Sequence, residues 1–319
     1  MFRSISTDMS RYENRNSYIK QLTEGDIVRH RDGSVWVVKG CVHPHEGFVA
    51  IPRVVDGKKL KRLMEVEEMI KRYYLHYIRN LPEIGRDVPI VPVGDVLEVR
   101  RWSIDGRSCG NAFLRQIIQT FDLLGLSCGI AGSHLGGYSS AESDVDIHCL
   151  NSPDAYSRIS SLYSLGVLKH LDFNEAIREA MEVSESLELK KHAELITKRY
   201  LQGVYKRRKV TIRIVDCSRV RGFLGPYVDF RRVELVVKIT ESDYRTPAIL
   251  RADVVRASTL VNKDLHLLTH RLRFVELPVG TLLSIEGAIA TNTSGNSIVN
   301  LDESKIEWLL LPSQSRATL

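Results

Sequence analysis

Alternating apolar and polar residues predict short strands near the start of the chain. The runs 27–29, 35–38 and 48–55 are rich in Val and Ile, and the pairs Gly25-Asp26 and Asp32-Gly33 separate them. A period of two is typical of strands that bury one face, and Gly-containing pairs of this kind mark turns. We therefore expect a small β-barrel or meander here, and it carries no catalytic motif.

The apolar period changes between residues 58 and 81. Apolar residues recur there at spacings of three and four, which predicts one amphipathic helix. Tyr74 and Tyr77 lie on its apolar stripe, where a tyrosine either stacks on a nucleic-acid base or packs into the core. The stripe positions favour the core. After this helix, residues 96–99 are expected to form a strand.

The middle of the chain mixes helical and strand-like segments. Helices are expected over 112–124, 173–183 and 187–203, and strands over 128–131, 144–147 and 210–216. The C-terminal part is β-rich again, with strands expected over 233–239, 271–275, 281–285 and 306–311.

This pattern predicts an α+β fold of three domains. Residues 1–104 would form a β-rich module with one amphipathic helix, and residues 105–222 a core of a short mixed sheet with helices. Residues 223–319 would form a second β-rich domain. Both flanking modules are expected to be barrel-like.

Asp144 and Asp146 are the strongest candidates for chemistry. They alternate with Val145 and Ile147, so both carboxylates face one side of a strand, roughly 6–7 Å apart along the chain. Two such carboxylates repel each other unless a cation lies between them. Oxygen ligands of this kind suit Mg²⁺ or Mn²⁺, with water and phosphate filling the other positions. We therefore predict a metal site at Asp144 and Asp146.

A Gly132-Ser133 turn precedes these acids, with ten residues between Ser133 and Asp144. If a helix starts at this turn, the Ser133 hydroxyl and the free backbone N–H groups could bind phosphate. The combination of an apolar-Gly-Ser turn, this gap and Asp-apolar-Asp-apolar resembles the signature of the DNA polymerase β-like nucleotidyltransferase superfamily. Gly137 and Ser143 fit further positions of that signature, whereas Gly136 stands where those proteins usually carry arginine.

The resemblance implies transfer of a nucleotidyl group from a nucleoside triphosphate to an acceptor, with release of pyrophosphate. In that superfamily three carboxylates hold two Mg²⁺ ions, and Asp144 and Asp146 match the first two, which makes them the expected catalytic residues. The third position, on the strand over 210–216, is Arg213, which could pair with an acid or hold a phosphate. Asp216 is the remaining candidate metal ligand, although in a regular strand it would face the opposite side. The order of β-module, core and β-module is similar to archaeal nucleotidyltransferase-domain proteins.

The charge distribution adds a candidate partner. The chain has a net charge of +6, yet residues 198–232 alone contain eleven Lys or Arg and two acids. A segment of this kind fits a polyanion, either the triphosphate or a nucleic acid, and a solvated basic face is the alternative. Lys209 and Arg213 are its candidate phosphate-binding residues.

Cysteine and hydropathy patterns bear on location. The five cysteines, at 41, 109, 128, 149 and 217, are scattered without a CxxC pair, so reduced and buried thiols in the cytoplasm are expected. No apolar run approaches the ~18–20 residues that span a bilayer, so no membrane partner is expected.

Two functions remain open from the sequence. The first is metal-dependent nucleotidyl transfer to an acceptor that the sequence does not identify. The alternative is a catalytically inactive nucleotide- or nucleic-acid-binding protein on the same fold, because Arg213 stands in place of a carboxylate. A third carboxylate in the folded site would favour the enzyme, and an ion pair of Arg213 with Asp144 or Asp146 would favour the binding protein.

Overall fold

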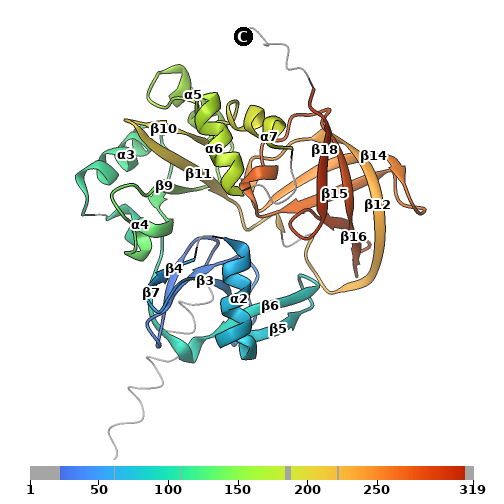
Figure 1. Cartoon of the computed structure of the whole chain (residues 1–319), viewed down its shortest axis with the longest axis horizontal. Coiled ribbons are helices and arrows are strands. Elements are labelled where there is room, and N and C mark those ends of the chain that lie inside the picture. The colour runs from blue at the N-terminus through green and yellow to red at the C-terminus, as the bar shows by residue number, and fades with distance from the viewer. Residues whose placement is uncertain (1–21, 61, 109, 184–187, 221–222, 313–319) are drawn as a thin grey trace, which may run out of the picture. The chain divides into compact units, whose positions relative to one another are not determined.

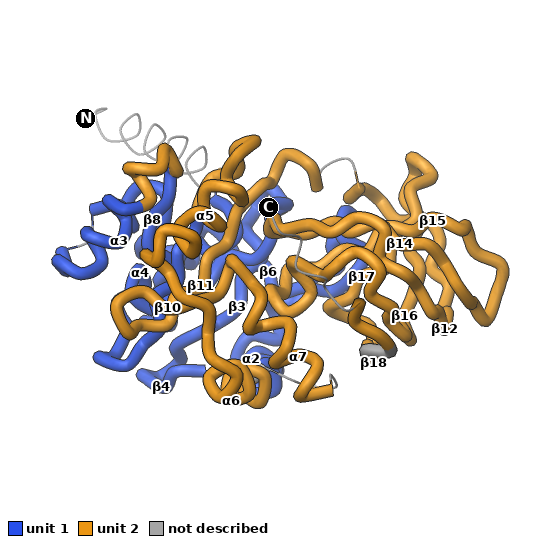
Figure 2. Tube along the Cα trace, turned by 90° about the horizontal axis from the view of Figure 1, so that it is seen from above, with its two compact units in different colours: residues 1–120, 127–148 blue, residues 121–126, 149–319 orange. Residues whose placement is uncertain are grey.

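The computed structural model describes residues 22–60, 62–108, 110–183, 188–220 and 223–312 (Figure 1). The chain divides into two compact units (Figure 2). Unit 1 comprises residues 1–120 and 127–148, and unit 2 comprises residues 121–126 and 149–319.

Unit 1 begins with an antiparallel sheet in the order β5-β6-β3-β2-β1-β7, with β4 paired to β3. Its elements are β1 Ile27–His30, β2 Val35–Val38, β3 Gly47–Val55, β4 Lys58–Lys59, α2 Leu63–Tyr73, η1 Leu75–Tyr77, β5 Ile78–Leu81, β6 Arg86–Pro92, η2 Val93–Asp95 and β7 Val96–Arg100. Val28 pairs with both Trp36 and Val99, and all three side chains face a core that also contains Phe48.

The helix expected over 58–81 is wrong in both of its ends. It starts at Leu63, ends at Tyr73, and gives way to a 3₁₀ turn and then to β5. Tyr74 leaves the helical conformation with φ −128° and ψ 21°, and the Tyr74 and Tyr77 side chains are buried beside Trp36. Both tyrosines therefore serve the core, as their stripe positions favoured.

The rest of unit 1 holds a helix, two neighbouring strands and the turn between them. Its elements are η3 Asp105–Arg107, α3 Ala112–Leu123, β8 Cys128–Ile130, α4 Gly132–Gly136 and β9 Val145–Leu150. The last residues of α3 and of β9 belong to unit 2.

Unit 2 starts with three helices and a hairpin. The elements are α5 Ala155–Ser164, α6 Phe173–Val183, α7 Leu189–Ile196, β10 Gln202–Tyr205 and β11 Arg208–Val215. β10 and β11 pair antiparallel, and the two-residue β13 Arg245–Thr246 pairs parallel to the end of β11. The helix expected over 187–203 is too long, because β10 already occupies its C-terminal residues.

The remainder of unit 2 is a closed barrel. Its elements are β12 Tyr227–Glu241, β14 Ala248–Ala257, β15 Asp264–Thr269, η5 Leu272–Phe274, β16 Leu282–Asn292, β17 Ser297–Asn300 and β18 Lys305–Leu310. The order β12-β14-β15-β17-β16 closes because β16 also pairs with β12, and β18 adds to β16. Leu235, Leu267 and Leu283 are among its fully or almost fully buried side chains.

The expected α+β class is wrong. The structure is β-rich, with 39% strand and 25% helix, and its main features are large sheets and a closed five-stranded barrel. It is not a helix-flanked nucleotidyltransferase core. The helices predicted over 58–81 and 187–203 were too long, and the sequence did not predict strands β4, β5, β6, β10, β13, β14, β15 and β17. Residues 272–274, expected as a strand, form a 3₁₀ turn.

Two further points concern domains and membranes. The predicted domain boundaries after residues 104 and 222 stay predictions, and Gly222 itself lies outside the described residues. Within the part of the chain that the structure describes, no helix combines the length and apolar character needed to cross a membrane.

Candidate functional site

The Gly-Ser turn lies directly against one of the two predicted metal ligands. The Ala131 N–H donates to the backbone oxygen of Asp146 at 2.8 Å, which ties the end of β8 to β9. Gly132 has φ +58°, and a Cβ atom built on it would lie 1.9 Å from Oδ2 of Asp146. The structure therefore brings Gly132 and Asp146 together, and only glycine fits at position 132 with the Asp146 side chain where it is.

Asp144 and Asp146 share one side of the chain at the start of β9. Val145 and Ile147 are completely buried, whereas both aspartates are partly exposed. The alternation predicted from the sequence is thus present, with Asp144 one residue before the strand. The two carboxylates belong to the same partly solvated face.

Ser133 lies in a short helix rather than at the start of a long one. α4 contains five residues, and the side chain of Ser133 is buried. Its carbonyl oxygen accepts the N–H of Gly137 and that of Tyr138, so the turn closes on itself. A helix this short has few aligned peptide dipoles, so its contribution to phosphate binding is small.

Basic and aromatic side chains of unit 1 surround this turn. Lys59 Nζ lies 5.5 Å from the ring centroid of Tyr138, and Arg100 donates to the carbonyl of Leu135 at 3.2 Å. Burial raises the pKa of Tyr138 to about 12, with Arg53 opposing the shift and Asp146 adding to it. Both charged groups therefore lie close to the Tyr138 hydroxyl. Sequence reasoning missed Arg53, Lys59, Arg100 and Tyr138, because no motif links β3, β4 and β7 to the turn.

The other predicted site residues, Lys209, Arg213 and Asp216, belong to unit 2, and each makes contacts with other residues of unit 2. Arg213 donates from Nη1 to the carbonyl of His270 at 3.0 Å. Lys209 forms an ion pair with Glu179. These contacts hold β11 to neighbouring segments of its own unit.

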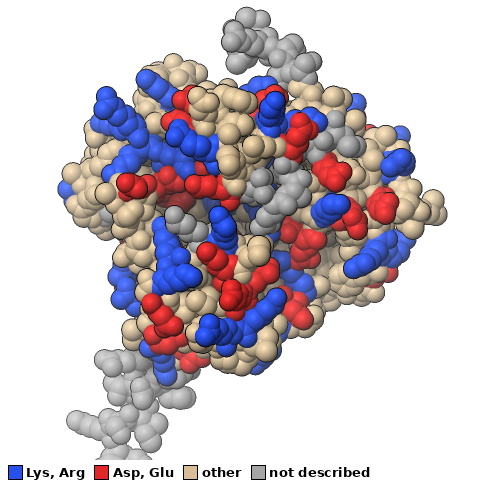
Figure 3. All heavy atoms as spheres, in the orientation of Figure 1, with Lys and Arg blue, Asp and Glu red and all other residues tan. Residues whose placement is uncertain are grey.

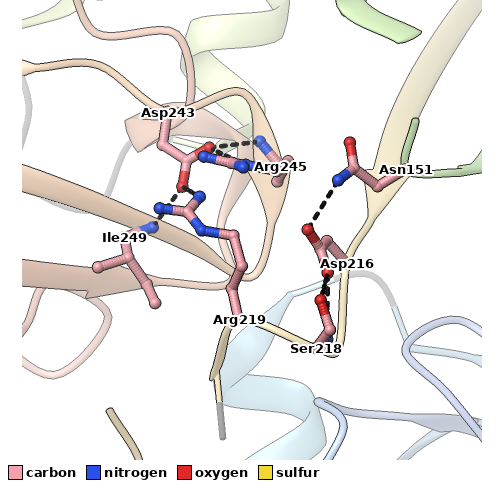
Figure 4. Close-up of polar contacts among 7 residues, drawn as sticks. All are labelled: Asn151, Asp216, Ser218, Arg219, Asp243, Arg245 and Ile249. Carbon is pink, nitrogen blue, oxygen red and sulfur yellow. Dashed lines mark hydrogen bonds and ion pairs between the residues drawn. The ribbon is translucent and has the colours of Figure 1, made fainter. Parts of the chain in front are cut away.

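Asp216 is already hydrogen-bonded through both carboxylate oxygens (Figure 4). Oδ2 accepts from Asn151 Nδ2 at 2.7 Å, and Oδ1 accepts from the Ser218 hydroxyl at 2.6 Å and from its N–H at 3.1 Å. The residue follows the end of β11 and is buried. Its carboxylate thus shapes the turn after β11, and this is a structural task.

A second buried carboxylate in the same close-up was not foreseen from the sequence. Asp243 is 1% exposed and accepts from Arg219, from Arg245 and from the N–H of Ile249 (Figure 4). Burial raises its pKa to about 6, against hydrogen bonds and the Arg219 charge that lower it. It connects the start of β14 to the segment after β11.

The metal prediction can be tested against the donor set. Among the described residues, no group of three or more His, Cys, Asp or Glu is placed to hold a metal ion. A cation at Asp144 and Asp146 would have two carboxylate ligands, which fits Mg²⁺ because that ion keeps several waters and phosphate oxygens. Two carboxylates would be enough for one Mg²⁺, and the described residues offer no group of three ligating side chains that would hold a second ion.

Several basic residues of the segment over 198–232 are engaged in contacts within the protein, whereas Lys198, Lys206, Arg207, Arg231 and Arg232 are exposed. Arg199 is buried and donates to the carbonyl of Arg273, Arg219 pairs with Asp243, and Arg231 pairs with Asp229. On the face drawn in Figure 3, basic and acidic side chains are interspersed. The count of basic residues in this segment therefore overstates the charge available to a polyanion.

The cysteines correct another expectation. Cys41, Cys128, Cys149 and Cys217 are disulfide-bonded, whereas the sequence suggested free thiols; Cys109 lies outside the described residues. Bonded pairs far apart in the sequence leave no spacing motif, so the sequence could not show them.

Comparison with known proteins adds no relative: no family model, no curated protein and no solved structure matches this chain.

Proposed function

We propose that the chain transfers a nucleotidyl group from a nucleoside triphosphate to an acceptor, using Asp144 and Asp146 with Mg²⁺ or Mn²⁺. The observation that carries this proposal is the close approach of Asp146 to Gly132, which sets a carboxylate against an apolar-Gly-Ser turn.

Different residues of unit 1 would bind the cation and the phosphates. Asp144 and Asp146 would hold the cation, and Lys59 and Arg53 would hold the phosphates of the bound nucleotide beside Tyr138. When bound, Mg²⁺ would offset the charge that develops on the transferred phosphate. The Gly132-Ser133 turn would offer its backbone to a phosphate that enters it.

A second candidate is a protein that binds a nucleotide or nucleic acid without transferring it. Two observations favour it: Asp216 is bonded to Asn151 and Ser218, and no triad of acidic or other ligating residues occurs among the described residues. Arg213, Lys209 and the segment over 198–232 would then contact the ligand in place of metal ions.

The test compares two acid variants with a matched control. The full-length chain, Asp144→Asn, Asp146→Asn and Asp87→Asn are incubated with Mg²⁺ and each of the four nucleoside triphosphates, and pyrophosphate is measured. Asp87 is an exposed aspartate of unit 1 on β6, so its change removes the same charge elsewhere. We expect loss of release by about a hundredfold or more in the first two variants, because each removes a metal ligand.

The outcomes separate the two functions. Release that persists in both acid variants contradicts the site assignment. Mn²⁺ binding that depends on the two acids without any release supports the binding protein. Salt-dependent binding of duplex or single-stranded nucleic acid, measured by fluorescence anisotropy, would then identify the segment over 198–232 as the contact if neutralising Lys206, Arg207, Arg208 and Lys209 lowers the salt dependence.

We propose a cytoplasmic location for this activity. The structure has four disulfide-bonded cysteines. Stable disulfides in cytosolic proteins are found mainly in hyperthermophiles, so the proposal implies that the chain comes from such an organism. Blocking free thiols at cell lysis, followed by mass spectrometry, would show whether these cysteines are bonded in the cell. Bonded cysteines together with a periplasmic or secreted fraction would contradict the location.

A further inference from the structure

Unit 1 contains a cavity that plays no part in the proposed nucleotide site. It has a volume of about 290 Å³ and lies where α2, η1 and the ends of β1 and β3 meet. Its lining consists of two aspartates, two histidines, three tyrosines and one valine: His30, Asp32, Val55, Asp56, Tyr73, Tyr74, His76 and Tyr77. Among the residues that the structure describes, no lysine or arginine lines it.

The inner wall of the cavity is fixed by hydrogen bonds. Tyr74 donates to Asp32 Oδ2 at 2.7 Å, and Ser34 donates to Oδ1 of Asp32 from both its N–H and its hydroxyl. Tyr77 donates to Asp95 at 2.7 Å, and its hydroxyl lies 2.8 Å from Nε2 of His30. The tyrosine rings are therefore held in place before any ligand arrives.

The outer wall is accessible. Tyr73 is 42% exposed, and Asp56 and His76 are exposed as well. The side chain of Asp32 is 42% exposed despite its hydrogen bonds, so its carboxylate also reaches the cavity. The guanidinium of Arg72 lies 5.2 Å from the Tyr73 ring centroid, so a cation of the chain itself already lies beside this ring.

The charges around the cavity favour positive ligands. Partial burial raises the pKa of Asp32, but the hydrogen bonds from Ser34, Tyr74 and His30 outweigh it and lower that pKa to about 2. Asp32 is therefore ionised at neutral pH. Burial raises the pKa of Tyr74 to about 12, and the carboxylates of Asp32 and Asp56 contribute to that shift. The tyrosine hydroxyl thus lies within the field of both acids.

We propose that this cavity binds an alkylammonium group, with Asp32 and Asp56 balancing its charge, the exposed ring of Tyr73 contacting its carbon atoms, and the buried Tyr74 and Tyr77 forming the floor. Aromatic rings with carboxylates beside them recognise ammonium and methylated ammonium groups through the ring quadrupole and charge. A phosphate is disfavoured, because two aspartates would repel it. A metal ion is disfavoured too, because both carboxylate oxygens of Asp32 already accept hydrogen bonds from Ser34 and Tyr74.

The alkylammonium group could come from a lysine side chain of a partner protein or from a free diamine. Both present the same chemistry to the cavity, and titration distinguishes them. This inference does not depend on nucleotidyl transfer, because the cavity shares none of its lining residues with the proposed nucleotide site.

The experiment follows amide signals of the ¹⁵N-labelled full-length chain by NMR. The probes are choline, its uncharged isostere 3,3-dimethylbutan-1-ol, Nα-acetyl-lysine methylamide, the Nζ-trimethylated form of that compound, and 1,4-diaminobutane. We expect saturable shifts at residues 73–77 and at Asp56 for the cations and none for the isostere.

Three variants and a control test the assignment. Asp56 has φ +49°, a conformation that asparagine adopts readily, so Asp56→Asn keeps the backbone and removes one charge. We expect it to weaken binding by about fivefold, the upper range for an exposed ion pair, and Asp32→Asn to weaken it more. Tyr73→Ala should weaken binding of the trimethylated compound most. Glu83→Gln removes an exposed charge outside the cavity and should change nothing.

Each outcome decides the proposal. Absent shifts, equal shifts with the uncharged isostere, or full affinity in both aspartate variants would overturn it. Tighter binding of the lysine compounds than of the diamine assigns the ligand to a partner's lysine, and the reverse order assigns it to a free diamine.

Discussion

Gly132→Ala tests the contact on which the nucleotide site depends. An alanine at φ +58° costs about 1–2 kcal/mol, because Cβ crowds the backbone in the left-handed conformation. Its Cβ would also lie 1.9 Å from Asp146 Oδ2 and 2.7 Å from Cγ, so the carboxylate must move. Displacing a packed group adds about 1–3 kcal/mol, which gives a loss of roughly 2–5 kcal/mol in the free energy of unfolding.

Gly57→Ala is the matched control. Gly57 belongs to unit 1 and has φ +73°, but a Cβ there would meet nothing within 4 Å. Its substitution should cost only the backbone term, about 1–2 kcal/mol. Asp146→Ala removes Oδ2 and Cγ and leaves only Cβ, 3.0 Å from the added atom, so Gly132→Ala made in that background should cost only a little more than Gly57→Ala.

The measurement is urea unfolding followed by tryptophan fluorescence. Two of the three tryptophans, Trp36 and Trp102, are buried in unit 1 and report on its unfolding. The double-mutant cycle gives the coupling between residues 132 and 146 directly. Equal costs of Gly132→Ala with and without the Asp146 side chain would refute the claim that the carboxylate lies against the turn.

Three further predictions concern stability. Burial lowers the pKa of His192 to about 3, and the charges of Arg199 and Arg273 add to the shift. Between about pH 3 and 6.5 the unfolded chain therefore binds more protons than the folded one. The free energy of unfolding should rise with pH in that range. His192→Phe should reduce this slope in urea titrations at several pH values, and it should not destabilise, because both buried ring nitrogens have no hydrogen-bond partner among the described residues. Leu267→Ala, at a completely buried barrel position, should cost about 2–5 kcal/mol, whereas the exposed Leu260→Ala should cost little in the same assay. Reductant should lower the melting temperature if the four bonded cysteines stabilise the chain, by a loss on the order of 2–5 kcal/mol per disulfide, and an unchanged calorimetric scan with complete alkylation would contradict this.

Local periodicity determined several elements from the sequence alone. The strands β1, β2 and β11 and the helix α6 lie where alternation or helical spacing placed them, because each buries one face of its own segment. Spacing also singled out Gly132 and Asp146, which the structure joins. In both cases the residues that form the pattern and the structure that they predict lie within one short segment of the chain.

Tertiary structure decided the rest. The apolar stripe is consistent with a helix over 58–81, yet the helix ends at Tyr73. Tyr74, which follows it, and Tyr77, at the end of the 3₁₀ turn, are buried without α-helical backbone around them. The barrel closes through β12 and β16, and pairing of strands distant in sequence leaves no periodic mark that selects the partner. The α+β prediction failed for the same reason: it was made from the periodicity of each segment separately and could not include the pairing between segments.

The candidate site divides in the same way. The sequence supplied the two acids and the turn, since these lie within one short stretch. The structure supplied Lys59, Arg53 and Tyr138 beside them, and it engaged Asp216 with Asn151 and Ser218. Folding decides which carboxylate faces a ligand and which one supports a turn, because it brings together partners that are distant in the sequence. Local sequence patterns do not show which of these partners will be close in space.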